Sequence, residues 1–177
     1  MITNNIISAA AENDKGARQQ IYESYLGYVL TIIRRYGISS SDEVDMVQDI
    51  FIEIFVSIYR YDSNKGEFKP WLRAVSVNQI LKRIKKSKRL EIVGLNQDND
   101  VKETSLQLGE YDTEYIVREI AQLSKGYRTV FNMYEIDGYS HKEIANKLSI
   151  TVQTSKSQLS RAKSILRDKL SKFIAVL

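Results

Sequence analysis

The chain has 177 residues, a formal net charge of +4 and no cysteine. That length suits one ordinary domain or two small ones, and the missing thiols exclude disulfides and thiolate metal sites. His141 is the single histidine, which argues against a histidine-based metal centre or a Ser-His-Asp triad. One proline and eight glycines favour long helices over a strand-rich sandwich, which would need frequent turns.

The N-terminal residues show no targeting pattern. Residues 1–16 lack the basic start and apolar core of a signal peptide. No apolar run in the sequence approaches the ~20 residues that span a bilayer. We therefore expect a cytoplasmic protein without membrane insertion.

Charge is distributed in blocks along the chain. Residues 82–89 hold six basic side chains, 98–114 hold six acidic ones, and 156–172 again hold six basic ones. Two basic blocks separated by an acidic one predict two modules that face polyanions and are joined by a linker.

The first half of the chain begins with predicted helices. Asp14 is a favoured capping residue, and apolar positions repeat after it at helical spacing as far as Tyr36. A shorter helix is expected before it, near 6–11. Gly37 fits the left-handed residue that ends such a helix. Ser40, with a glutamate three residues later, has the spacing of a capping box that opens the next helix.

That next helix, over about 42–59, carries two stripes. The first is apolar and is predicted to be core: Val44, Val47, Phe51, Ile54, Phe55 and Ile58. The second has spacings of three and four and is largely polar: Asp45, Gln48, Asp49 and Ile52. From the sequence alone, the second stripe is either a binding face or a solvated face.

A polar, aromatic-rich loop is predicted at 59–68. Pro70 suits the first turn of the helix after it, because the missing N–H of proline costs nothing there. From Trp71, which we interpret as a core residue rather than a stacking surface, helical spacing continues into the basic block. Residues 90–112 show little periodicity and many Asp, Asn and Gly residues, which is typical of a flexible linker.

Three or four shorter helices are predicted after the linker. Two lie near 113–123 and 125–136, and the last two form a helix-turn-helix within 140–166. Ser140 is expected to cap the third helix and Thr151 the fourth. The inward-facing residues of the fourth are predicted to be Val152, Leu159, Ala162 and Leu166.

The outer face of the fourth helix is cationic and rich in hydroxyls. It consists of Gln153, Lys156, Ser157, Ser160, Arg161, Lys163 and Ser164. A helix made only for solubility interleaves Glu with Lys, whereas this face lacks acids. It is therefore predicted to meet a polyanion, in the geometry that presents a helix to the DNA major groove. The alternative is a helical hairpin of a bundle with a solvated face.

Two stretches resemble region 2 of the sigma-70 family, as found in its small extracytoplasmic-function (ECF) members: DMVQDIFIEIF (45–55) and GEFKPWLRAVSVNQI (66–80). A third resembles region 4 of the same group: LSKGYRTVFNMYEIDGYSHKEIANKLSITVQTSKSQLSRAKSIL (123–166). The start of the chain, 6–25, is also similar. Both regions occur in the expected order with a linker between them.

The resemblance implies an all-α protein of two small helical domains joined by a flexible linker, the C-terminal one containing the helix-turn-helix. Region 2 would occupy 1–89, the acidic linker 90–112 and region 4 113–177. The protein would bind core RNA polymerase and direct it to promoters, with acids facing a basic partner. The implied polymerase contacts are Asp45, Met46, Gln48, Asp49 and Ile52.

The resemblance also implies that loop 59–68 holds a base flipped from the −10 element. Stacking on an aromatic side chain suits an unpaired base because it tolerates any sequence. The implied −10 contacts are Tyr59, Tyr61, Arg73, Ser76, Asn78, Gln79 and Arg83. Asn78 either pairs with a base edge or satisfies a buried carbonyl, whereas Phe68 is expected to be a core plug. The basic block 82–89 would neutralise phosphates.

In region 4, the residues that match −35-reading positions of the family are Lys156, Ser157, Ser160 and Arg161. His141 and Thr154 suit phosphate contacts. Ser149 stands where the family often has glycine, so we expect a turn conformation that serine tolerates. The implied partners are core RNA polymerase, promoter DNA (duplex at −35, single strand at −10) and an anti-sigma factor acting in trans. No cofactor, metal or small-molecule substrate is expected.

Two other classes of function are alternatives. A helix-turn-helix activator or repressor would show no polymerase affinity and would bind a palindromic site. The aromatic loop beside a basic helix argues against an activator or repressor, because a protein that binds only duplex DNA does not need aromatic residues to hold unpaired bases. A helical enzyme of nucleic-acid metabolism is disfavoured by the lack of a nucleophile–base constellation, so we do not expect an enzyme.

Overall fold

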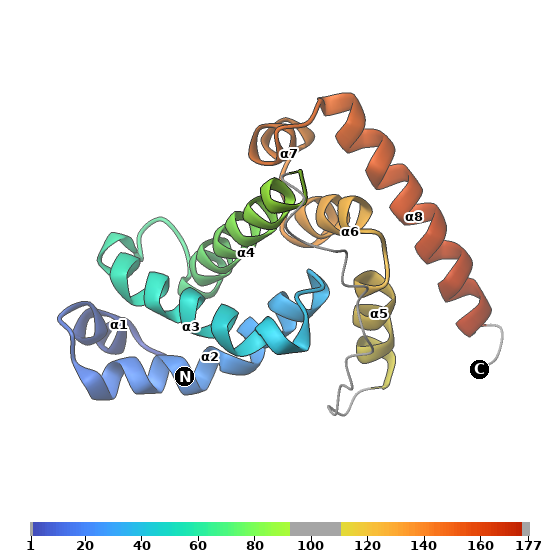
Figure 1. The fold of residues 1–177 in the computed structure, drawn as a ribbon. Helices are drawn as coiled ribbons and strands as arrows, with labels where there is room; N and C mark the ends of the chain where they lie inside the picture. Colours follow the sequence, from blue (N-terminus) through green and yellow to red (C-terminus); the bar gives the residue numbers. More distant parts are fainter. Residues whose placement is uncertain (1, 93–110, 175–177) are drawn as a thin grey trace. The chain divides into compact units, whose positions relative to one another are not determined.

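The structure, a computed structural model, describes residues 2–92 and 111–174, and side chains within 2–86 and 115–171. Every regular element in these residues is helical (Figure 1). The all-α fold predicted from the sequence is therefore confirmed for this part of the chain. Most of the predicted linker, 90–112, lies outside the described residues.

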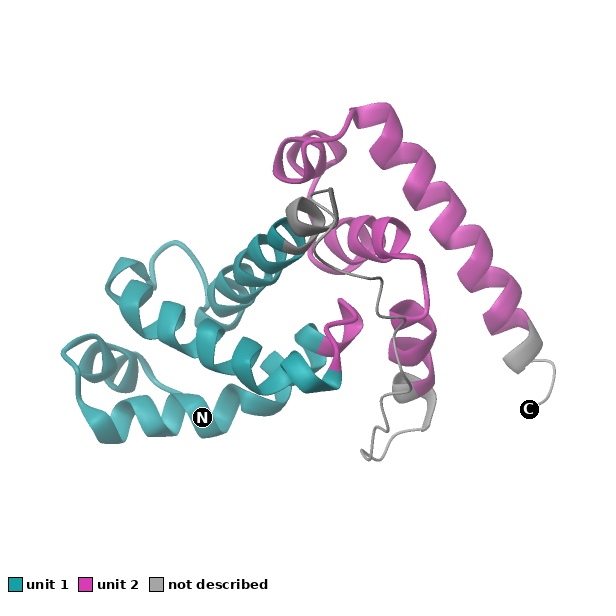
Figure 2. Cartoon of the chain, in the orientation of Figure 1, with its two compact units in different colours: residues 1–33, 40–86 teal, residues 34–39, 87–177 magenta. Residues whose placement is uncertain are grey.

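The chain separates into two compact units, coloured in Figure 2. Unit 1 contains Met1–Ile33 and Ser40–Lys86, and unit 2 contains Arg34–Ser39 and Ser87–Leu177. The short segment Arg34–Ser39 is grouped with unit 2 because its residues contact the C-terminal part of the chain. Each unit has its own buried residues and is described by itself.

Unit 1 is built from these elements: α1 (Asn4–Ala11), α2 (Lys15–Arg35, of which 34–35 belong to unit 2), α3 (Ser40–Ser57), the 3-10 helix η1 (Ile58–Arg60) and α4 (Phe68–Ile92). The predicted cap of α2 is confirmed, since the N–H of Ala17 donates to the Asp14 carboxylate at 2.7 Å. Pro70 is the third residue of α4, within its first turn as predicted. Sequence-local signals thus mark the starts of α2 and α4, whereas Ser40, expected to cap α3, is its first helical residue.

Aromatic pairs join the helices of unit 1 around an aliphatic core. The Tyr22 ring of α2 packs on Phe51 of α3, with ring centroids 4.6 Å apart. The Tyr25 ring meets Phe68 of α4 edge-on at 5.6 Å. Phe68 is buried, so its predicted role as a core plug is confirmed. These contacts determine which side of α3 and which side of α4 is exposed to solvent.

Unit 2 is built from these elements: α5 (Tyr111–Ala121), α6 (Lys125–Phe131), the π-helical turn η2 (Asn132–Ile136), α7 (His141–Leu148) and α8 (Val152–Ile174). The single helix predicted over 125–136 is thus an α-helix that ends in a π turn. Part of the core forms where α5, α6 and α8 meet: Ile120, Leu123, Ala162 and Leu166, with Tyr127, Phe131 and Leu170 packed against them.

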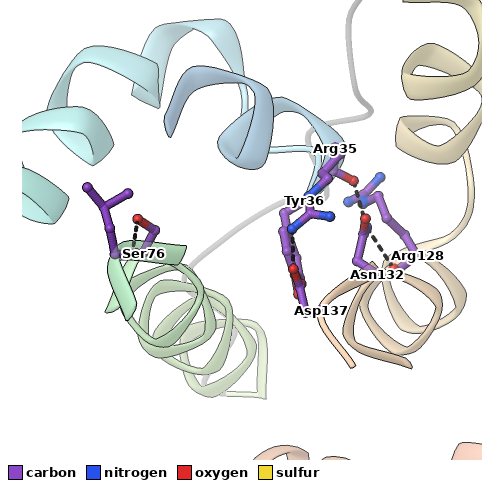
Figure 3. A network of polar contacts seen from close by, with 7 residues as sticks. Arg35, Tyr36, Ser76, Arg128, Asn132 and Asp137 are labelled. Carbon is purple, nitrogen blue, oxygen red and sulfur yellow. Dashed lines mark hydrogen bonds and ion pairs between the residues drawn. The ribbon is translucent and has the colours of Figure 1, made fainter. Parts of the chain in front are cut away.

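A buried polar network ties Arg34–Ser39 to α6 and η2 within unit 2 (Figure 3). Asp137 pairs with the Arg35 guanidinium and accepts a hydrogen bond from the Tyr36 hydroxyl at 2.7 Å. The Asn132 amide donates to the backbone carbonyls of Arg35 and Arg128 at 2.8 and 2.9 Å. Burial, followed by the Asp137 charge, raises the pKa of Tyr36, so the phenol stays protonated as a donor.

Gly37 approaches this network closely. Its φ is +67°, and a Cβ atom there would clash with the guanidinium of Arg128. Gly138 also has a positive φ, +78°, but nothing lies within 4 Å of its Cβ position. We expect Gly138→Ala to cost about 1–2 kcal/mol of unfolding free energy, from backbone strain alone. Gly37→Ala should cost a further ~1–3 kcal/mol, because Arg128 must also move.

Urea unfolding of the two variants beside the wild type checks this prediction. The Gly138→Ala protein is the matched control, since it shares the strained φ but not the close approach. Equal urea midpoints for the two variants would contradict the prediction, because they would show that the Arg128 side chain can move aside without loss of unfolding free energy.

Candidate functional site

One face of α3 combines carboxylates with exposed aliphatic side chains. Asp45, Gln48 and Asp49 are exposed as predicted, and Ile52 keeps 62% of its surface in solvent. Two further residues that the sequence reasoning missed share this face: Val44 and Val56, both well exposed. Carboxylates and apolar surface therefore lie side by side on this face.

Two assignments on α3 were wrong. Met46 is 1% exposed and lies in the core of unit 1, so its side chain is not on the surface to which we assigned it. Val44, predicted as core, is exposed instead. The buried side of α3 is centred on Met46, Ile50 and Ile54, which turns Val44 outward at helical spacing.

The two tyrosines that were predicted to stack on a base, in the loop after α3, have different environments. Tyr59, in η1, is 65% exposed, and the Arg60 guanidinium lies 5.2 Å from its ring centroid. Tyr61 instead packs on Phe68 at 5.2 Å and on Trp71 at 5.8 Å. The Tyr61 hydroxyl donates to the carbonyl of Gly66 at 3.0 Å. Tyr59 therefore has the exposed ring, and Tyr61 shapes the loop.

Trp71 has a mixed environment. Its ring stacks on Phe68, with centroids 5.4 Å apart, but the side chain is only half-buried. It is thus part of the aromatic cluster that anchors the loop to α4, rather than a fully buried core residue.

The assigned residues of α4 do not all face solvent. Ser76 is fully buried, and its hydroxyl donates to the Leu72 carbonyl at 2.8 Å (Figure 3). Its assignment as a DNA contact was wrong, because the hydroxyl is bonded inside the unit. Asn78 is exposed, and Arg73 and Gln79 are half-buried. These three residues keep surface in solvent along one helix.

The basic block begins at the surface of α4. Lys82, Lys85 and Lys86 are exposed or nearly so, and the side chains of 87–89 lie outside the described residues. Arg83 pairs with Asp42 of α3 at 3.1 Å, with both side chains partly exposed. Such an exposed pair contributes little stability.

In unit 2, α7 is opened by a complete capping box, as predicted. The Ser140 N–H donates to the Glu143 carboxylate at 2.8 Å, and the Glu143 N–H donates to the Ser140 hydroxyl oxygen at 3.3 Å. The Ser140 hydroxyl and N–H hold the pKa of Glu143 below its ordinary value of 4.5. The charged box is therefore complete at neutral pH and is lost only as the pH falls through that lowered pKa.

The turn between α7 and α8 departs from expectation. Ser149 has φ 55° and ψ 46°, the left-handed conformation that favours glycine, so the residue is not in a conformation that serine prefers. The N–H of Ile150 donates to the Ala145 carbonyl at 3.1 Å and closes the turn. The last carbonyls of α7 are hydrogen-bonded only if the residue after the helix is left-handed. Serine therefore adopts this conformation although it is less favourable in backbone energy for serine than for glycine.

The first half of α8 presents the predicted cationic, hydroxyl-rich face. The N–H of Thr154 donates to the Thr151 hydroxyl oxygen at 3.0 Å, which confirms the Thr151 cap. The exposed residues of the face include Gln153, Lys156, Ser157, Ser160 and Arg161. Arg161 is held from within unit 2, since its Nη1 donates to the Tyr127 hydroxyl at 3.2 Å. This contact raises the pKa of Arg161.

Two predictions on α8 need revision. Val152, predicted to point inward, is exposed, whereas Ser155 of the same turn is buried. Lys163 is ion-paired with Glu135 of η2 at 2.7 Å, so one acid does balance the outer face near its middle. Leu159, Ala162 and Leu166 are buried as predicted.

The sequence reasoning missed Ser155. Its side chain is fully buried, and its Oγ lies 2.9 Å from Nδ1 of His141. A signal was available, because Ser155 has helical spacing with the buried Leu159 and Ala162. His141, assigned to a phosphate contact, is half-buried and also stacks on Tyr134, with ring centroids 4.4 Å apart.

The described residues give no support to a membrane span or a metal centre. No helix in this part of the chain is both long and apolar enough to cross a membrane. No group of three or more His, Cys, Asp or Glu residues is gathered there in a way that could hold a metal ion.

Two family models match successive parts of the chain. The model for Sigma-70 region 2 matches residues 21–90, and the model for Sigma-70, region 4 matches residues 113–166. The ECF RNA polymerase sigma-E factor of Escherichia coli K12 is 26% identical over 184 residues, covering 96% of this chain and 94% of that protein. The ECF RNA polymerase sigma factor SigE of Mycolicibacterium smegmatis is 23% identical and is covered over 61% of its length, with 86% of this chain.

Solved structures share the fold. CnrH, in complex with the cytosolic domain of CnrY, has a TM-score of 0.51 at 22% identity, covering 94% of this chain and 96% of that one. The sigma factor RpoE of Bartonella quintana, in complex with the anti-sigma factor NepR, has a TM-score of 0.53 at 20% identity, covering 86% and 98%.

Regions 2 and 4 in this order, with an exposed acidic–aliphatic helix in one unit and a helix-turn-helix in the other, define a sigma-70-type transcription initiation factor. The chain belongs to the ECF sigma factors of this family.

Proposed function

We propose that this chain joins core RNA polymerase through the exposed face of α3 and directs the enzyme to specific promoters. The observation that supports this most strongly is the pair of unlike surfaces in one chain. Asp45 and Asp49 stand among exposed aliphatic side chains on α3, whereas α8 offers cations and hydroxyls. A repressor needs only the second surface, and the first suits a basic protein partner.

The −10 element is the proposed partner of the loop and of α4. Tyr59 offers its exposed ring to an unpaired base, and stacking of this kind contributes roughly 1–3 kcal/mol per base. Asn78, Arg73 and Gln79 follow the single strand along α4, and Arg83 with its neighbouring lysines meets the phosphates. These contacts exist only with the separated strand, so they offset the cost of melting.

The −35 element is the proposed partner of α8. Lys156, Ser157, Ser160 and Arg161 lie on the exposed half of a capped helix that follows a tight turn, the geometry of a recognition helix. Thr154 is half-buried near the start of α8 and suits a phosphate contact. The chain performs no catalysis in this scheme and acts in the cytoplasm, where the polymerase is.

We further propose that an anti-sigma factor in trans regulates the chain. The support is indirect: CnrH and the Bartonella RpoE, which share the fold, were each solved with a partner, the cytosolic domain of CnrY and the anti-sigma factor NepR. The α3 face is the surface such a partner would need to cover to block polymerase binding.

Run-off transcription tests the proposal. Purified protein is added to bacterial core polymerase on a library of duplex promoters, and transcripts that depend on the protein are sequenced. Shared boxes upstream of the start sites are the expected result. If the protein binds palindromic duplex DNA without polymerase and yields no transcripts, the activator or repressor alternative replaces this proposal.

A further inference from the structure

The single histidine sits where three elements of unit 2 meet. His141 is the first residue of α7, directly after the capping serine. Its ring stacks on Tyr134 of η2, with centroids 4.4 Å apart and an interplanar angle of 23°. Its Nδ1 lies 2.9 Å from Oγ of Ser155 on α8. One ring therefore touches η2, belongs to α7 and bonds to α8.

Ser155 gives this contact its importance. The residue is 0% exposed, and it lies on the side of α8 that packs against the rest of unit 2. A buried hydroxyl without a partner is costly, because it has given up its hydrogen bonds to water. Imidazole and hydroxyl can each donate or accept, so His141 satisfies the hydroxyl in either tautomer.

The hydrogen bond between His141 and Ser155 holds the first turn of α8, directly before the residues proposed to face DNA. Ser155 is the fourth residue of α8, and Lys156 and Ser157 follow it at once on the exposed side. The turn before α8 contains Ser149 in the left-handed conformation and is closed by the hydrogen bond from Ile150 to Ala145. A side-chain bond between the two helices supplies a second constraint.

We propose that His141 is a positioning residue that sets the angle at which α8 is presented to the −35 element. The inference rests on the proposed function and replaces the assignment of His141 to a phosphate. One ring nitrogen and one ring face are already engaged by Ser155 and Tyr134. By holding Ser155, the ring orients the residues of α8 that select bases. It does not increase affinity by contacting a DNA phosphate.

Three variants of the full chain test this: His141→Phe, Ser155→Ala and the double variant. Phenylalanine keeps the stack on Tyr134 and leaves the Ser155 hydroxyl unpaired. Alanine removes that hydroxyl. The double variant has neither polar group, and replacement of both partners by apolar groups can be nearly neutral. Asn146→Ala, at an exposed position of α7, is the control.

Each protein is assembled with core polymerase, and the holoenzyme's affinity is measured for promoters with an intact or a base-substituted −35 element, at several salt concentrations. His141→Phe is expected to lower the ratio of the affinity for the intact promoter to the affinity for the base-substituted promoter about five- to tenfold. The salt slope should stay unchanged. The double variant should recover a ratio within about twofold of the wild type.

Two outcomes would overturn the proposal. The first is an equal fall in affinity for both promoters, the signature of a lost contact to the DNA backbone, which carries no sequence information. The second is a double variant whose effects are the sum of the single ones. Urea unfolding of the wild type and these three variants measures the coupling of His141 to Ser155 without DNA, so it tests this contact separately from the reading of a −35 element.

Discussion

Asp45→Arg/Asp49→Arg is expected to reduce promoter-dependent transcription by core polymerase at least ~100-fold, because placing like charges against a basic partner costs several kcal/mol. Both carboxylates lie on the exposed face of α3 and have Ile52 and Val56 beside them. Their replacement disturbs no buried group of unit 1. The measurement is run-off transcription over a titration of the variant against a fixed amount of core enzyme.

The matched control reverses two other exposed charges. Glu12→Arg/Glu23→Arg changes the net charge by the same amount at exposed positions just after α1 and on α2. It should retain transcription within about twofold of the wild type. Equal loss in the two double variants would mean that overall charge, and not the α3 face, governs polymerase binding. Circular dichroism checks that both variants keep their helices.

The second large effect is expected on α8. Lys156→Ala/Arg161→Ala should weaken binding to a promoter with an intact −35 element by about 1–3 kcal/mol for each base that the helix no longer reads. The weakening on a promoter without that element should be smaller, because only phosphate attraction remains there. Competition between the two promoters for limiting holoenzyme gives this difference directly.

Arg118→Ala/Arg167→Ala serves as its control. Arg118 is exposed on α5 and Arg167 is exposed in the second half of α8, so the same charge is removed away from the first turns of the recognition helix. If this pair reduces the preference for the −35 element as much as the first pair does, the base-reading role of Lys156 and Arg161 is incorrect.

Several helix ends were the parts of this fold that the sequence could predict, whereas the turn at Ser149 was not. Asp14, Ser140 and Thr151 all cap the helices expected of them, because a cap depends on residues within one turn of the chain. Gly37 likewise takes the left-handed conformation foreseen for it. Such signals need no knowledge of what packs against the helix.

The errors concern which side of a helix the fold covers. Val44 and Val152 are apolar but exposed, whereas Met46 and Ser76 are buried. Residue type alone favoured the opposite placement for most of them. On an amphipathic helix the buried arc can rotate by one position, and tertiary neighbours decide which position is covered. Ser155 was missed because serine is a polar residue type, although its helical spacing with Leu159 and Ala162 places it on the buried side of α8.

The exposed aliphatic side chains of α3 also affect the protein while it is unassembled. Val44, Ile52 and Val56 place apolar surface on one helix face, and a net charge of +4 provides only modest repulsion between copies. We therefore expect a concentrated, partner-free preparation to self-associate through this face. Under the proposed function, co-expression with a partner that covers α3 should keep the chain in solution.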